Sequence, residues 1–88
     1  MIKEEGKLIY IKDGEFKEVE AYLQHEEWFD IEIAALIDGK EEFLYYFRYN
    51  NKWMQKNKDF DKDDPNSCQY LPYDKYKIKE VIFTKTIK

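Results

Sequence analysis

The sequence has very little of the residue types from which enzymes, zinc modules and disulfide-stapled domains are built. It holds one cysteine, Cys68, and one histidine, His25, which excludes an intrachain disulfide and a zinc site of several Cys and His ligands. Its only glycines, Gly6, Gly14 and Gly39, lie too far apart for a phosphate-binding loop. Since no nucleophile and base occur at a recognisable spacing, we predict a non-enzymatic protein with no catalytic residues, metal or cofactor.

Long hydrophobic runs are also missing. No stretch has the length of a signal peptide or of a membrane-spanning helix. A lone cysteine suits a reducing compartment, so we expect a cytoplasmic protein. The 88 residues suffice for one hydrophobic core and not for two, which predicts a single compact domain over residues 1–88.

Aromatic residues are abundant, with six Phe, eight Tyr and two Trp. They occur in alternating segments separated by two Asp-Gly pairs and one Asn-Asn pair, which is a strong hairpin signal. Residues 8–12 and 15–19 flank Asp13-Gly14 and form the first expected hairpin. From residue 15 to 27 the apolar spacing fits either a strand or a helix, and we favour a strand as far as Leu23.

The central segment has the clearest alternation. Five residues share one face of a strand: Phe29, Ile31, Ile33, Ala35 and Ile37. The next strand places on one face Phe43, Tyr45, Phe47 and Tyr49. A two-residue Asp38-Gly39 loop would put these two sets on opposite faces, whereas a three-residue loop that includes Ile37 would put them on the same face. We favour the three-residue loop because it gathers the apolar residues together.

The second half of the chain is less regular. A turn at Asn50-Asn51 is expected to lead into a short strand over 52–55, with Met54 on the core face. A long polar loop follows at about 56–74, and a phase change predicts a bulge near Lys79-Glu80. The predicted fold class is mainly β, or α+β with one short helix. We expect a small antiparallel sheet of about five strands, built from consecutive hairpins and forming a partly open barrel.

Charge divides the chain into two halves. Residues 1–42 hold thirteen acidic residues and five lysines, whereas residues 43–88 hold six acidic and ten basic residues. Within the loop, Asp59, Asp61 and Asp63 alternate like the start of a calcium loop. The sixth position is Asp64 in place of glycine and the twelfth is Tyr70 in place of glutamate, so we predict no calcium site.

One hypothesis is single-stranded nucleic-acid binding through an aromatic and basic sheet face made of Tyr46, Arg48, Trp53, Lys77 and Lys79. The net charge of −4 disfavours it, because phosphate binding depends on a basic surface. Another hypothesis is a small homodimeric structural or adaptor domain.

The hypothesis we favour is an inhibitor that docks on a basic cleft of one partner protein, such as a nuclease or another nucleic-acid enzyme. The predicted contacts are Glu18, Glu20, Glu26, Glu27, Trp28, Asp30 and Glu32. A second contact surface would comprise Tyr46, Arg48, Trp53, Asp59, Asp61 and Asp63. In size, charge and aromatic content alone, the chain resembles small phage counter-defence proteins, including anti-CRISPR proteins, and bacterial immunity proteins.

Overall fold

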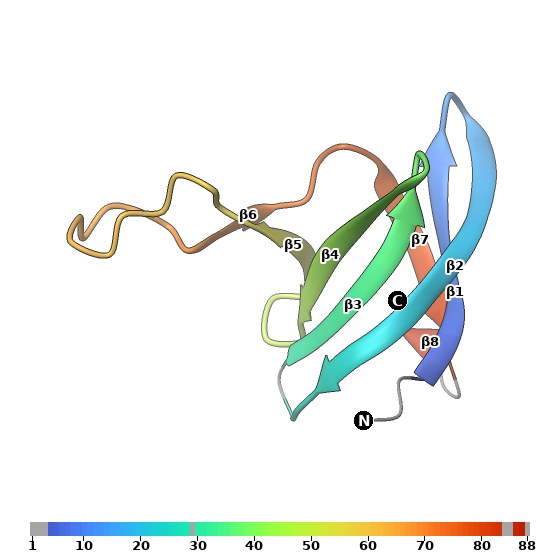
Figure 1. Cartoon of the computed structure of the whole chain (residues 1–88), viewed down its shortest axis with the longest axis horizontal. Helices are drawn as coiled ribbons and strands as arrows, with labels where there is room; N and C mark the ends of the chain where they lie inside the picture. Colours follow the sequence, from blue (N-terminus) through green and yellow to red (C-terminus); the bar gives the residue numbers. More distant parts are fainter. Residues whose placement is uncertain (1–3, 29, 84–85, 88) are drawn as a thin grey trace.

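The computed structural model describes residues 4–28, 30–83 and 86–87, and all of its regular structure is β (Figure 1). Its strands are β1 (Glu4–Lys12), β2 (Glu15–Glu26), β3 (Asp30–Ile37), β4 (Lys40–Phe47), β5 (Lys52–Lys56), β6 (Tyr70–Pro72), β7 (Lys77–Ile82) and β8 (Thr86–Ile87). They form one antiparallel sheet in the order β6-β5-β4-β3-β2-β1-β7-β8, curled into a half-barrel. The mainly-β, partly open barrel is confirmed, whereas the expected count of about five strands is too low.

The two Asp-Gly hairpins form as tight two-residue turns. Asp13 and Gly14 have φ angles of 52° and 78°, and Asp38 and Gly39 have φ angles of 54° and 78°. Two successive positive φ values define the turn whose twist matches that of the flanking strands. Asn51 also has a positive φ, of 55°, at the turn between β4 and β5. The positions of the three predicted turns are therefore confirmed.

The predicted three-residue loop between β3 and β4 is wrong. Ile37 pairs with Lys40, so Ile33 lies opposite Leu44 and Ile31 lies opposite Tyr46. The positive φ of Asp38 places this residue inside the turn, which leaves Ile37 in the ladder and shifts the register by one residue. Phe43, Tyr45 and Phe47 consequently lie on the face opposite the predicted one, and Phe43 remains 47% exposed.

The core lies on one side of the sheet and draws residues from strands far apart in the sequence. Its largest fully buried side chains are Leu8, Ile31, Ile33, Ile37, Leu44 and Val81. Trp53 packs against this core with its ring centroid 5.0 Å from that of Tyr46, and Met54, opposite Tyr45, lies on the other face. The prediction that Met54 lies on the core face, with Trp53 and Tyr46 on the opposite one, is therefore wrong. Phe29 belongs to the predicted core face but lies outside the described residues.

Both sheet irregularities lie in long strands. β2 is a strand along its whole length, which confirms the strand prediction for residues 15–23 and extends it to Glu26. Its register against β3 shifts between Leu23 and His25. In the pairing of β7 with β1, Ile9 faces Glu80 and Tyr10 faces Ile78, so Lys79 is the extra residue and the predicted bulge is confirmed.

The predicted loop at 56–74 is partly a hairpin. Residues 70–72 pair with residues 54–56, and the remaining segment projects from the sheet (Figure 1). The projecting segment is organised by short-range hydrogen bonds in which the side-chain oxygens of Asn57, Asp61 and Asp64 accept from backbone N–H groups two residues ahead. The described residues contain no helix that could span a membrane.

A polar cluster joins the β3–β4 turn to neighbouring elements. The Tyr76 hydroxyl donates to Asp38 Oδ2 at 2.6 Å, and Lys12 Nζ donates to Asp38 Oδ1 at 2.8 Å. These donors, Lys12 first, lower the pKa of the Asp38 carboxyl to about 2. The turn that sets the register of β3 and β4 is thus tied to the end of β1 and to the segment before β7.

Candidate functional site

The side of the sheet opposite the core, which we call the outer face, carries most of the acidic residues of β1 to β4. Strand alternation and register place six carboxylates there: Glu5, Glu18, Glu20, Asp30, Glu32 and Glu41. Among the described residues of these four strands, Lys7 is the only cation on this face, and its Nζ lies 3.2 Å from Glu18 Oε1. The outer face of β1 to β4 is therefore strongly acidic, and we call these six carboxylates the acidic face.

Apolar and aromatic side chains lie among these carboxylates. Tyr22 faces Glu5 on β1 and Ala34 on β3, and Ala34 in turn faces Phe43 on β4. Leu36 lies opposite Glu41 in the neighbouring row and is 38% exposed. The acidic face thus surrounds an apolar strip, formed by the half-buried Tyr22 and the exposed Leu36 and Phe43.

The electrostatics of Tyr22 reflect this crowding of negative charge. Its hydroxyl donates to Glu20 Oε2 at 3.2 Å. That hydrogen bond, together with the negative charges of Glu20, Glu5 and Glu41, raises the pKa of the Tyr22 phenol. A positively charged group placed here would relieve the same mutual repulsion of carboxylates.

The predicted contacts at the end of β2 do not all belong to the acidic face. Because the register shifts before His25, His25 lies opposite Glu32, and Glu26 lies opposite the buried Ile31. Glu26 Oε2 there accepts from Arg48 Nη2 at 2.9 Å. Arg48 Nη1 also donates to the backbone carbonyls of Glu27 and Trp28, at 2.9 and 2.8 Å. Arg48 therefore fixes the β2–β3 turn, and its guanidinium is not free for a partner.

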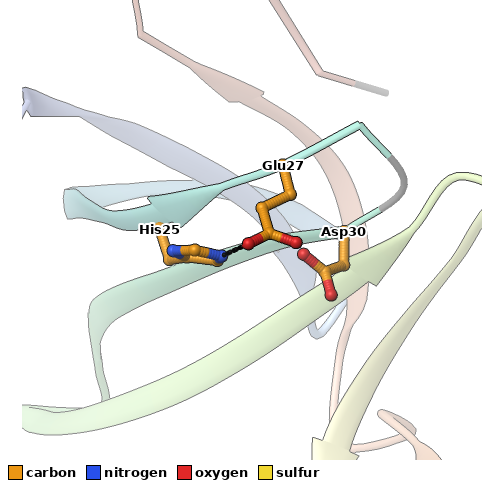
Figure 2. A group of neighbouring side chains, drawn as sticks. All are labelled: His25, Glu27 and Asp30. Atoms are coloured by element: carbon orange, nitrogen blue, oxygen red, sulfur yellow. Dashed lines mark ion pairs between the residues drawn. The ribbon is translucent and has the colours of Figure 1, made fainter.

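The same turn exposes Trp28 and brings three ligand-type side chains together. Trp28 is 88% exposed, as a contact residue would be. Figure 2 shows His25, Glu27 and Asp30 pointing toward one another, with His25 Nε2 3.1 Å from Glu27 Oε1. One potential ligand atom from each of the three lies within 4.8 Å of the others. Of these three residues, Glu27 and Asp30 were predicted only as partner contacts, and no role was predicted for His25.

The predicted second contact surface is not assembled as one surface. Tyr46 is 6% exposed, and its hydroxyl donates to Asn51 Oδ1 at 3.1 Å. Trp53 is half-buried against it, whereas Asp59, Asp61 and Asp63 lie exposed on the projecting loop. Two rings of the predicted stacking platform are therefore packed within the fold.

Four residues of the outer face were not among the predicted contacts. Glu5 and Glu41 are distant in sequence from the acidic segment of residues 15–32, and the register alone brings them beside Tyr22. Leu36 and Phe43 alternate like core residues. The sequence also allowed a two-residue Asp38-Gly39 loop, and that choice would have predicted that Phe43 faces outward.

Comparison of the chain with protein-family models, with curated proteins and with solved structures finds no match. Its function is therefore inferred from the chemistry of its own surface.

Proposed function

We propose that this protein is a non-enzymatic binding protein whose acidic face docks on a basic surface of one partner protein. The observation that carries the proposal is the arrangement of six carboxylates and one lysine around the apolar strip of Tyr22, Leu36 and Phe43. Exposed aromatic and aliphatic side chains supply binding energy once they are desolvated, and the surrounding charges set orientation and association rate.

The partner chemistry follows from the sign of the charge. A basic surface on a protein is most developed where it binds nucleic acid, because phosphate binding depends on clustered Lys and Arg. A nuclease or another nucleic-acid enzyme is the partner class we favour, and the acidic face would compete there with phosphates. This role is that of an inhibitor such as those of phage counter-defence or bacterial immunity. We place the protein in the cytoplasm, where the exposed thiol of Cys68 would stay reduced.

The other two hypotheses receive less support. Stacking of single-stranded nucleic acid would need the rings of Tyr46 and Trp53, which pack against each other and the core. Homodimerisation through the outer face would bring two acidic surfaces together, and the like charges would repel each other.

A matched pair of charge-reversal variants tests the proposal. Glu20→Lys with Glu41→Lys changes the acidic face, and Asp59→Lys with Asp63→Lys makes the same change in net charge on the projecting loop. Each variant and the wild type serve as immobilised bait in nuclease-treated lysate of the native host, followed by mass spectrometry. Affinity for the captured protein is then measured directly for all three.

We expect the wild type and the loop variant to retain one dominant basic protein. The face variant should bind it at least about tenfold more weakly, since like charges brought together across an interface cost several kcal/mol of binding free energy. Equal binding by all three would remove the acidic face from the interface, and loss in the loop variant alone would move the site to residues 57–69. Light scattering and a low-salt oligonucleotide titration detect the homodimer and nucleic-acid alternatives.

A further inference from the structure

The β2–β3 turn brings the imidazole of His25 and the carboxylate of Glu27, which have no part in the proposed docking, beside Asp30 at the edge of the acidic face. The register shift in β2 turns His25 toward the outer face, opposite Glu32. Glu27 follows in the turn, and Asp30 begins β3. Without the shift, Gln24 would lie opposite Glu32 and His25 would lie opposite the buried Ile31, so the irregularity itself creates the mixed cluster.

The distances between the three donor side chains are close to those between the ligand atoms of a bound metal ion. Ligands at about 2.0–2.2 Å from a tetrahedral Zn²⁺ lie about 3.3–3.6 Å from one another. His25 Nε2 and Glu27 Oε1 are already 3.1 Å apart, and the three donors lie within 4.8 Å (Figure 2). The exposed side chains of His25 and Glu27 can close the remaining gap by rotation.

Asp30 supplies an independent reason to expect a cation. Its Oδ1 atom is screened from solvent, and it accepts no hydrogen bond from the residues that the structure describes. A buried carboxylate oxygen without a donor is rare, because such an atom has lost its water without replacement. The contact between His25 Nε2 and Glu27 Oε1 does not involve Asp30, whereas a metal ion held by the imidazole and by one oxygen of each carboxylate would place a positive charge beside the Asp30 carboxylate.

The backbone of the turn is held in place around the cluster. The N–H group of Glu27 donates to the Asp30 carbonyl oxygen at 2.9 Å, which closes the turn. Arg48 Nη1 donates to the carbonyl oxygens of Glu27 and Trp28, and Arg48 Nη2 donates to the Glu26 carboxylate. The Arg48 charge is thereby paired with Glu26, and Glu27 and Asp30 are positioned before any metal binds.

We propose that His25, Glu27 and Asp30 form a binding site for a first-row divalent cation, with Zn²⁺ the best match. One imidazole nitrogen and two carboxylate oxygens suit Zn²⁺ and its neighbours, whereas Ca²⁺ and Mg²⁺ prefer oxygen ligands alone. Three protein ligands leave a fourth position open to water or to a side chain of another molecule.

The test uses untagged, full-length protein carrying Cys68→Ser, so that the site is separated from thiol binding. Zn²⁺ is titrated by calorimetry, and the ring signals of His25 are followed by ¹⁵N NMR. Since His25 is the only histidine, its signals report on the site directly. We expect one Zn²⁺ per chain, with the shift located at Nε2, the nitrogen that faces Glu27.

Two single variants and one control complete the test. His25→Gln and Asp30→Asn preserve size, and each should raise the dissociation constant for Zn²⁺ by at least about tenfold. Asp59→Asn with Asp63→Asn, on the projecting loop, should leave the dissociation constant unchanged. The proposal is overturned if the His25 signals do not move at millimolar Zn²⁺, if His25→Gln binds as tightly as the parent, or if the loop variant alone loses binding.

Discussion

Gly6 of β1 lies against Ile82 at the end of β7 and against Phe83, and its replacement by alanine should destabilise the fold. A Cβ atom at this position would overlap the Ile82 carbonyl oxygen and the Phe83 ring. The carbonyl belongs to the backbone that pairs with β1, where Lys7 faces Ile82, so it cannot move without separating the two strands. Gly6→Ala therefore acts as an overpacking substitution in a tight interface.

The magnitude follows from two opposing effects. Overpacking costs roughly 1–3 kcal/mol, and alanine recovers about 0.5–1 kcal/mol because glycine is the poorer strand residue. Because one overlap is with a backbone carbonyl, the upper part of the overpacking range, about 2–3 kcal/mol, applies. The net loss of unfolding free energy should therefore be about 1–2.5 kcal/mol, which lowers the Tm of a domain of this size by roughly 4–20 °C. Urea unfolding followed by circular dichroism measures the first quantity, and a thermal scan measures the second.

A double-mutant cycle identifies which contact causes the loss of stability in Gly6→Ala. Removal of the ring in Phe83→Ala relieves one of the two overlaps, so the double variant should lose less stability than the sum of the single variants. A Gly6→Ala protein that is as stable as the wild type would show that β1 and β7 are not packed as closely as described. Additive single variants would show that Phe83 does not contact the new methyl group.

Two other predictions concern polar groups of the fold. Asp38→Asn keeps a residue that tolerates the positive φ but removes the carboxylate. The pKa of Asp38 in the folded protein is about 2, below its unfolded value, so the wild type should have the higher Tm above pH about 4. This difference in Tm should disappear as the pH falls through about 2. A difference that persists at pH 1.5 would exclude the carboxylate as its source. Tyr73→Phe removes a buried hydroxyl that has no hydrogen-bond partner within residues 4–28, 30–83 and 86–87, so the unfolding free energy should stay constant or rise by up to about 1 kcal/mol. A loss above about 1 kcal/mol in urea unfolding would mean that the hydroxyl is paired.

The strand content and the turns were predictable because they depend on neighbouring residues. Asp-Gly pairs adopt two successive positive φ values at low cost, so the β1–β2 and β3–β4 hairpins follow from the local sequence. The bulge at Lys79 was predictable as well, because an inserted residue reverses the alternation of a strand. Part of the acidic face was also predictable from the local sequence, since Glu18, Glu20 and Glu32 alternate with apolar residues.

The register between hairpins was not predictable with the same certainty. The preference for a three-residue loop rested on the assumption that all large apolar residues share one face. The half-barrel has a second face, on which Phe43 is exposed and Tyr45 is covered by Tyr70 from β6. A one-residue difference in loop length exchanges these faces, and the local sequence permits both lengths.

The sequence by itself thus determined a β protein with tight Asp-Gly turns and an acidic first half, since each of these properties depends on residues close together in the chain. Only the tertiary structure decided which residues share a surface. The register of β1 against β2 places Glu5 opposite Tyr22, the register of β4 brings Glu41 to the same face, and the shift in β2 brings His25 to Glu27 and Asp30. Such juxtapositions depend on how the strands pair within the whole sheet, because no local preference fixes the position of a residue relative to another strand.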